Sequence, residues 1–218
     1  MPEPVTIIGV GAGLAALTTH LARRFFNLAK EVFDILAGSV LLALALPILA
    51  VCALIIKLSS RGPVVFTQIR VGQDGKPFRM YKLRTMYVDA ESASGAVWAA
   101  KGDPRVVPAC RWMRRCHADE LPQLLNVVRG DMSLVGPRPE RPEIIEELEK
   151  VYPEIRRRLQ VRPGITGLAQ IRNGYDTSVE AFRDKLLADL EYIERRNWST
   201  ELRILAGTLT KLNDKTAH

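Results

Sequence analysis

Residues 34–57 read DILAGSVLLALALPILAVCALIIK, and this stretch decides how the chain is organised. Between Asp34 and Lys57 lie 22 residues without a formal charge, enough for a helix that crosses a bilayer. A secretory signal peptide is a poor match, because 34 residues precede the run and no small-residue cleavage site follows it. A soluble body of roughly 160 residues would rarely surround a helix that is apolar on every side. We therefore predict a membrane-inserted helix.

Pro47 bears on whether this helix crosses the membrane or turns back. A proline inside a helix leaves the carbonyl of Ala43 without its partner, so a kink is expected. The arms on either side have roughly 12 and 9 residues, and each reaches about halfway through a bilayer. Because basic residues flank both ends, charge does not place the ends on opposite sides. A re-entrant helix with both ends cytoplasmic is favoured, and a kinked spanning helix is the alternative. The flanking basic residues are Arg23, Arg24 and Lys30 before the run and Lys57, Arg61 and Arg70 after it.

The charged residues are concentrated after the apolar run. The 218-residue chain carries a net charge of +7, and 28 of its 31 lysines and arginines lie beyond residue 56. Residues 57–118 hold 12 basic against 4 acidic residues, so an anion-binding surface should draw mainly on them. Net charge is the only feature that suggests nucleic acid, and such a function would leave the apolar run unexplained. We therefore expect no nucleic-acid partner.

Two motifs resemble cofactor or metal sites but lack the context that those sites need. Gly11, Gly13 and Ala16 match a dinucleotide-binding fingerprint, yet the acidic residues that follow lead into the apolar run rather than ending a strand. We interpret residues 1–30 as an apolar, helical extension of uncertain role. The second motif consists of Cys110, Cys116 and His117, which could suggest a zinc site. No further ligand pair follows at zinc spacing. Three cysteines also exclude a fully paired disulfide framework.

The polar part of the chain predicts an α-rich α+β domain. Two β-prone runs, 62–68 and 78–84, flank an Asp74-Gly75 turn, which is a hairpin signal. Apolar residues recur at helical spacing over 108–128, and a new helix should begin near Asp119 because proline is tolerated in a first turn. Amphipathic helices are predicted over 142–160 and 179–212.

Five local groups combine arginine or acidic residues with glycine and proline. Rigid loops can present a planar guanidinium group to phosphate at little ordering cost. A lone arginine on a basic surface is more often solvated, however, and Asp119 alone is explained as a helix cap. Spacing therefore leaves both phosphate binding and a purely structural role open. The groups are residues 81–86, 103–105, 119–123, 130–139 and 162–167.

Together these motifs resemble the monotopic bacterial phosphoglycosyl transferases, also called bacterial sugar transferases. The resemblance runs from about Lys30 to about Leu212, and the apolar run with Pro47 is similar to the family's re-entrant membrane helix. Asp119-Glu120 is similar to its catalytic pair, and Gly136-Pro137-Arg138-Pro139 to its phosphate-binding loop. The implied organisation is a re-entrant helix over 31–58, followed by a small interfacial catalytic domain over 59–218.

The resemblance implies an enzyme that transfers a sugar-1-phosphate from a UDP-sugar to a polyprenyl phosphate such as undecaprenyl phosphate. Mg²⁺ would be the cofactor, UMP the leaving product, and the reaction the first membrane step of glycan assembly. The implied location is the bacterial inner membrane, with the catalytic domain on the cytoplasmic face and a homodimer as one candidate assembly. The alternative is a non-catalytic membrane scaffold, which would have no use for adjacent carboxylates beside basic loops. The transferred sugar is not identified by any residue.

The family's residue roles carry over by position. Asp119 would attack the β-phosphorus of the donor, and its place near a helix start would favour the charged carboxylate. Glu120 would hold Mg²⁺, with Asp119 beside it. Arg114 would complete the catalytic group. The substrate-binding candidates are Arg138, Pro137, Arg105, Arg84, Arg172 and Tyr175.

Two departures from the family pattern affect these roles. Leu46 precedes Pro47 where the family usually has serine, so no adjacent hydroxyl can satisfy the freed carbonyl. The family often has Asn-Gly-Arg soon after Ala-Gln, whereas Gln170 is followed by Ile171, Arg172 and Asn173. Either Arg172 takes the part of that arginine or the donor is recognised differently.

Overall fold

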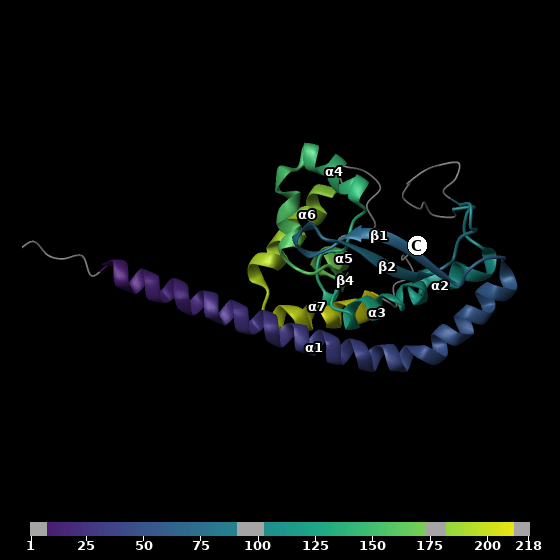
Figure 1. Ribbon diagram of the computed structural model, residues 1–218, viewed down its shortest axis with the longest axis horizontal. Coiled ribbons are helices and arrows are strands. Elements are labelled where there is room, and N and C mark those ends of the chain that lie inside the picture. The colour runs from purple at the N-terminus through teal and green to yellow at the C-terminus, as the bar shows by residue number, and fades with distance from the viewer. Residues whose placement is uncertain (1–7, 91–102, 173–181, 212–218) are drawn as a thin grey trace, which may run out of the picture.

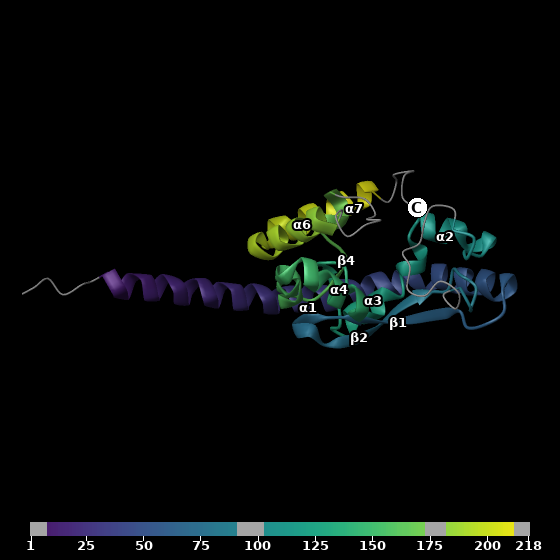
Figure 2. The same ribbon diagram turned by 90° about the horizontal axis from the view of Figure 1, so that it is seen from above.

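The computed structural model describes residues 8–90, 103–172 and 182–211. A long helix lies beneath a small body of short helices, with a hairpin at one side (Figure 1). Figure 2 shows the hairpin strands β1 (Val65–Val71) and β2 (Pro77–Leu83) on one side of the long helix α1 (Ile8–Ser59). Helices α6 (Phe182–Arg195) and α7 (Trp198–Lys211) lie on the other side. This arrangement confirms the α-rich fold with a short hairpin that the sequence predicts.

Helix α1 (Ile8–Ser59) is continuous and contains Pro47. It curves around the body in its C-terminal half, so the proline lies in a bent but unbroken helix (Figure 1). The helix also runs without interruption past residue 30, where the sequence suggested that an extension ends. Gly11 and Gly13 lie inside it and do not form the strand-to-helix turn of a dinucleotide site.

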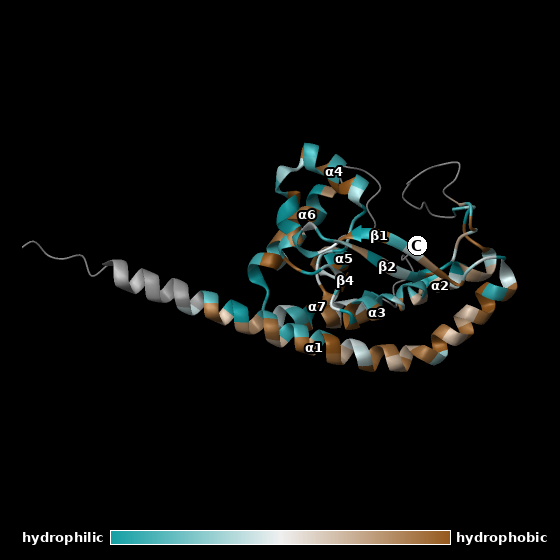
Figure 3. Cartoon of the chain, in the orientation of Figure 1, coloured by the Kyte–Doolittle hydropathy of each residue, from teal (hydrophilic) through white to brown (hydrophobic). Residues whose placement is uncertain are grey.

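One narrow stripe of α1 packs on the body, and the rest of its apolar surface is exposed. The stripe residues recur four or seven positions apart, which places them on one face. Gly38 allows close approach to helix α3 (Gln123–Val128), since an added Cβ would lie 2.9 Å from Val127 Cγ1. Leu44 is 67% exposed, and Figure 3 shows that the residues along the C-terminal half of the helix are mostly hydrophobic. From His20 to Ser59, α1 is long and apolar enough to cross a membrane. The stripe consists of Lys30, Asp34, Gly38, Ala45, Cys52 and Ile56.

The predicted hairpin is present. Strand β1 (Val65–Val71) pairs antiparallel with β2 (Pro77–Leu83). The connecting 3₁₀ turn η1 (Gln73–Gly75) has Asp74 at φ 55° and Gly75 at φ 77°. Aspartate and glycine both tolerate this left-handed region of backbone conformation. Strand β2 carries Lys82, whose Nζ lies 2.9 Å from Glu120 Oε1, so the hairpin reaches the predicted catalytic pair.

The predicted catalytic pair lies in a segment of short helical turns. In chain order these are η2 (Pro108–Cys110), α2 (Arg111–Arg115), η3 (Ala118–Glu120) and α3 (Gln123–Val128). His117 has φ 56° and separates α2 from η3. The expected break near Asp119 is confirmed, but α3 starts at Gln123 because Pro122 occupies its N-cap.

Two of the loop groups meet in a parallel strand pair. Strand β3 (Ser133–Val135) lies beside β4 (Gly164–Thr166), and α5 (Leu168–Arg172) follows. Gly136 is needed at this junction, because an added Cβ would lie 2.4 Å from the carbonyl oxygen of Arg162. The pairing holds the start of the 136–139 loop against the rest of the body.

Each predicted amphipathic helix proves to be two helices. The first divides into α4 (Pro142–Val151) and the 3₁₀ segment η4 (Pro153–Gln160), because Pro153 cannot continue α4. The second divides into α6 (Phe182–Arg195) and α7 (Trp198–Lys211), where Asn197 Oδ1 accepts a hydrogen bond from Thr200 N at 3.0 Å. The N-terminal part of α7 contacts α1, with 2.9 Å between Glu201 Oε2 and Lys30 Nζ.

Candidate active site

Glu120 is clamped by two cations from distant parts of the chain. Arg138 Nη2 and Nη1 donate to the two carboxylate oxygens at 2.6 and 3.1 Å, and Lys82 Nζ donates to Oε1 at 2.9 Å. The Glu120 side chain is only 12% exposed. Burial acts to raise the pKa of this carboxyl, but Arg138 and Lys82 hold it well below its usual value. Glu120 is therefore an anion at neutral pH.

Asp119 lies beside Glu120 in a different electrostatic environment. It is 8% exposed, and no hydrogen bond to its carboxylate occurs within the described ranges. Burial and the neighbouring Glu120 charge raise its pKa, although Lys82, Arg114 and His117 act in the opposite direction. The charge-favouring effect expected from a helix start is thus outweighed, because η3 is a single short turn and the site is desolvated. The pKa of Asp119 is therefore raised, whereas its place near a helix start led us to expect a lowered one.

Arg114 lies near this pair, as expected. It belongs to α2, and its Nη1 is 3.5 Å from Thr85 Oγ1 on the segment after β2. Its positive charge lowers the pKa of Asp119. Arg114 can therefore favour the ionised form of that carboxylate without a direct ion pair.

Buried contacts hold the loop that carries Arg138. The carbonyl of Pro137 accepts from Gly164 N at 2.9 Å, and the carbonyl of Arg138 accepts from Arg158 Nη2 at 3.0 Å. Arg158 is in turn paired with Asp189, with 2.7 Å between Nε and Oδ2. A loop fixed in this way can present the guanidinium group of Arg138 with little loss of entropy. Pro137 contributes to the position of the loop through its backbone carbonyl, which accepts the hydrogen bond from Gly164 N.

A second arginine supports the same loop. Arg70 Nη1 donates to the carbonyl of Pro139 at 3.1 Å and lies 3.8 Å from Glu140 Oε2. Burial lowers the pKa of Arg70 to about 10. Arg70, Arg158 and Lys82 contact Glu120 or the loop that carries Arg138, but the sequence analysis did not assign them to the site. Lys82 and Arg70 had a signal, because both lie in segments that resemble the family's front half, whereas Arg158 had none.

The other predicted residues that the structure describes have partners elsewhere than the Asp119-Glu120 pair. Arg105 makes a bidentate pair with Asp103, with 2.6 Å between Nη2 and Oδ2. Arg84 donates to backbone carbonyls near the end of α1. Arg172 pairs with Glu191 on the exposed surface. Tyr175 lies outside the described residues.

The donor set of the pair fits Mg²⁺ bound together with a diphosphate. Mg²⁺ usually takes one or two carboxylates and completes its octahedron with phosphate oxygens and water. Asp119 and Glu120 supply two adjacent carboxylates, and the like charge that raises the pKa of Asp119 would be relieved by a cation. Among the described residues, no group of three or more His, Cys, Asp or Glu forms a metal cage.

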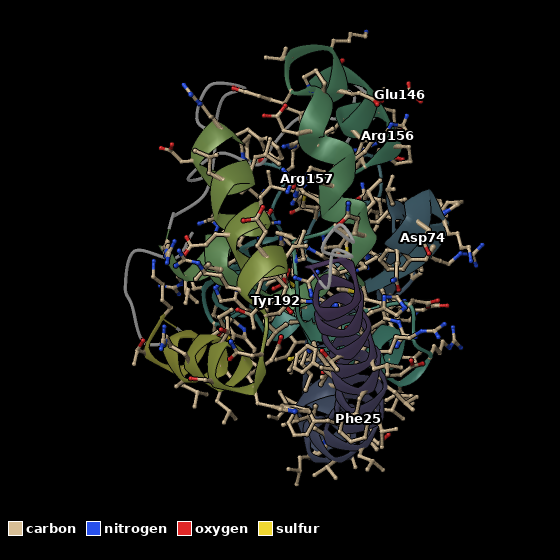
Figure 4. All side chains as sticks on the ribbon, turned by 90° about the vertical axis from the view of Figure 1, so that its left-hand side faces the viewer. Phe25, Asp74, Glu146, Arg156, Arg157 and Tyr192 are labelled. Carbon is tan, nitrogen blue, oxygen red and sulfur yellow. The ribbon has the colours of Figure 1, made fainter. Side chains whose placement is uncertain are left out.

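A separate polar cluster fixes α1 on the body. Lys30 Nζ lies 3.1 Å from Asp34 Oδ2 and 2.9 Å from Glu201 Oε2 on α7. Ser133 Oγ donates to Asp34 Oδ2 at 2.6 Å. The hydroxyl of Tyr192 is 2.8 Å from Glu201 Oε1, and Figure 4, which looks along α1, shows Tyr192 beside the helix. The cluster therefore joins α1 to β3, α6 and α7.

Known proteins are similar in sequence to this chain over most of its length. The family described as bacterial sugar transferase matches residues 25–215. The chain is 44% identical over 194 residues to a UDP-glucose:undecaprenyl-phosphate glucose-1-phosphate transferase of Caulobacter vibrioides, covering 88% of this chain and 72% of the relative. An undecaprenyl-phosphate glucose phosphotransferase of Komagataeibacter xylinus is 48% identical over 191 residues, which are 84% of this chain and 35% of the relative.

A third relative carries a different sugar in its name. It is the UDP-N-acetylgalactosamine-undecaprenyl-phosphate N-acetylgalactosaminephosphotransferase of Aeromonas hydrophila, 42% identical over 176 residues, with 81% of this chain and 41% of the relative covered. The family match extends from within α1 through α7 and includes the Asp119-Glu120 pair and the Arg138 loop. The chain therefore belongs to the bacterial sugar transferase family and is a phosphoglycosyl transferase.

Proposed function

We propose that this enzyme transfers a sugar-1-phosphate from a UDP-sugar to a polyprenyl phosphate and releases UMP, as the first membrane step of glycan assembly. The observation that carries the proposal is the buried carboxylate of Asp119 beside Glu120, on which Lys82 and Arg138 converge. The names of the relatives support undecaprenyl phosphate as the acceptor. They differ in the sugar, so the donor's sugar is left open.

The chemistry proceeds in two half-reactions on Asp119. A carboxylate oxygen attacks the β-phosphorus of the donor, and the bond from that phosphorus to the bridging oxygen breaks with its electron pair leaving on UMP. The phosphosugar remains on Asp119 as an acyl phosphate. An oxygen of the polyprenyl phosphate then attacks the same phosphorus, and the Asp119 carboxylate leaves. Lys82 and Arg138 are placed to stabilise charge on the phosphoryl oxygens.

Donor binding would change the partners of Glu120 and Arg138. In the free enzyme these side chains neutralise one another. A diphosphate offers oxygens to the guanidinium fork of Arg138, while Glu120, with Asp119, would hold Mg²⁺. Bound Mg²⁺ would neutralise the diphosphate charge that repels an attacking carboxylate. The buried ion pair thus keeps both binding groups charged and in place before the substrate arrives.

We infer that α1 enters the membrane and that both of its ends stay on one side. Asp34 at one end of the apolar run contacts Ser133, and Ile56 at the other end packs in a core cluster with Leu83 and Met113. A straight crossing would separate the two ends by about 30 Å of hydrocarbon, yet both contact the same polar body. The proposed location is the cytoplasmic face of the bacterial inner membrane. A homodimer stays a prediction.

A donor-only reaction tests the mechanism. Enzyme with Mg²⁺ and the correct UDP-sugar should release UMP up to one equivalent and retain phosphosugar on Asp119, and steady-state kinetics should be ping-pong. Asp119→Asn should abolish label and turnover, because an amide is a poor nucleophile. Asp74→Asn, in the exposed hairpin turn, is the matched control and should behave as wild type. UMP release that requires the acceptor, without labelled protein, would replace this mechanism with direct transfer.

A further inference from the structure

Two polar atoms at the C-terminal end of α1 are buried without a hydrogen-bond partner. They are Ser60 Oγ and Arg84 Nη1. Arg84 is only 5% exposed, and its other two side-chain nitrogens each donate a hydrogen bond: Nε to the carbonyl of Pro63 at 2.5 Å and Nη2 to that of Ser60 at 3.1 Å. A buried charged donor that lacks an acceptor is unfavourable, so an acceptor from outside the described chain is expected.

Gly62 brings the backbone against this guanidinium group. It has φ +118°, and a Cβ added there would lie 3.5 Å from Arg84 Cζ and 3.6 Å from Nη1. The same Cβ would lie 2.6 Å from Val88 Cγ2, so a side chain at residue 62 does not fit here without a shift. Val88 itself is 60% exposed, so Gly62 lies beside a surface side chain.

Ser60 adjoins the end of α1, and Arg84 adjoins the end of β2, the strand that carries Lys82. Ser60 directly follows α1, beside the exposed cations Lys57 and Arg61. Arg84 N donates to Val64 O at 2.8 Å and so extends the hairpin ladder by one residue past β2. Lys82, which holds Glu120, is two residues earlier, on the same face of the strand and about 7 Å away along it.

We propose that Ser60, Gly62 and Arg84 bind the phosphate headgroup of the polyprenyl phosphate acceptor. A guanidinium N–H and a hydroxyl match phosphate oxygens. The exposed apolar surface of α1 ends at this point and suits the lipid chain. The inference rests on the proposed function for the identity of the acceptor. It places the acceptor phosphate on the membrane side of Lys82 and the donor diphosphate at Arg138.

Ser60→Ala is the main test, because the serine hydroxyl has no partner to lose in the free enzyme. The expected result is an increase of about tenfold in the KM for polyprenyl phosphate, with an unchanged donor-only burst of UMP. Ser59→Ala is the matched control, since Ser59 Oγ is exposed and donates to Ile55 O in its own helix. Arg84→Lys should raise the same KM, and Arg61→Lys at the exposed neighbour should not.

Direct binding separates this site from the mechanism. Polyprenyl phosphate is titrated into wild-type and Ser60→Ala enzyme without donor, in neutral phospholipid nanodiscs and in nanodiscs that also contain phosphatidylglycerol. Weaker binding by the variant in both membranes supports the acceptor site. Equal affinities, or a difference abolished by phosphatidylglycerol because a bulk lipid occupies the site, would overturn it. Failure of the proposed function would instead appear as a missing UMP burst in the wild type.

Discussion

Arg138 and Glu120 pair through both terminal guanidinium nitrogens and both carboxylate oxygens, at 2.6 and 3.1 Å. One of these residues was expected to bind phosphate and the other a metal ion. Their pairing holds the guanidinium group and the carboxylate in fixed positions as a neutral pair. Lys82 adds a second positive charge at 2.9 Å from Glu120, so the site is ready for an anion.

Arg138→Lys should remove most of the activity. An ammonium group cannot make two parallel hydrogen bonds to a carboxylate or a phosphate, so UMP release should fall by about tenfold or more. The same change should raise the pKa of Glu120, because Arg138 is the largest of the influences that lower it. Arg156→Lys at the exposed pair with Glu149 is the control and should keep full activity. A fully active Arg138→Lys enzyme would show that this arginine has only a structural role.

Asp119→Asn should abolish turnover and increase stability. The substitution removes a buried carboxyl whose pKa is raised by burial and by the adjacent Glu120 charge. Loss of that unfavourable charge should stabilise the protein by on the order of 1 kcal/mol at pH 7, a common result at strained active sites. Thermal unfolding in detergent, compared with Asp74→Asn, measures the effect. A midpoint below that of wild type would contradict this electrostatic account of the site.

The rate of the donor-only burst should fall on acidification above the usual Asp pKa of 3.8. A raised pKa means that Asp119 takes up its proton, and ceases to be a nucleophile, at a higher pH than an ordinary aspartate. Glu120 does not set this limb, because its pKa is held well below 4.5. The pH profile of burst rate measures the midpoint.

Arg114→Gln should move that midpoint to higher pH, because Arg114 lowers the pKa of Asp119. Arg115→Gln changes the same charge on an exposed position of the same short helix and should leave the midpoint in place. If Arg114→Gln changed the amplitude of the burst but not the midpoint, Arg114 would act by contact with the substrate rather than through Asp119.

Lys30→Met should strongly destabilise the attachment of α1. The lysine lies between the buried carboxylates of Asp34 and Glu201, and its removal leaves both without their cation. Breaking a buried ion pair in this way costs about 3–5 kcal/mol. Chemical unfolding in detergent should show the loss, whereas Lys57→Met at an exposed site should show little. Adding Glu201→Gln to Lys30→Met should recover part of the stability, since one uncompensated charge is then removed.

Cysteine labelling should place both ends of the apolar run on the same side of the membrane. Arg24→Cys and Lys57→Cys are made in a Cys116→Ser background, because Cys116 is the exposed native thiol and Cys52 and Cys110 are buried. A maleimide that cannot cross the inner membrane should label neither site until that membrane is opened. Wild-type Cys116 reports the side on which the catalytic body lies. Labelling of only one engineered site from the periplasm would establish a spanning helix.

Local patterns in the sequence were enough to predict the elements that depend on neighbouring residues. The uncharged run before Lys57 predicts α1, because twenty or so apolar residues leave few alternatives to a membrane helix. The Asp74-Gly75 turn predicts the hairpin through its tolerance of the left-handed region. The division at Asn197 was missed, because one N-cap side chain can begin a new helix, α7, without interrupting the apolar period.

The sequence by itself determined the apolar helix, the hairpin and the adjacent carboxylates. Only the tertiary structure decided which cations face those carboxylates, because Lys82 and Arg138 lie 38 and 18 residues from Glu120. Only it decided that burial raises the pKa of Asp119, and that two donors of Arg84 go to carbonyls at the end of α1. The physical reason is that desolvation and ion pairing depend on long-range packing, which β3 and β4 establish by pairing distant loops.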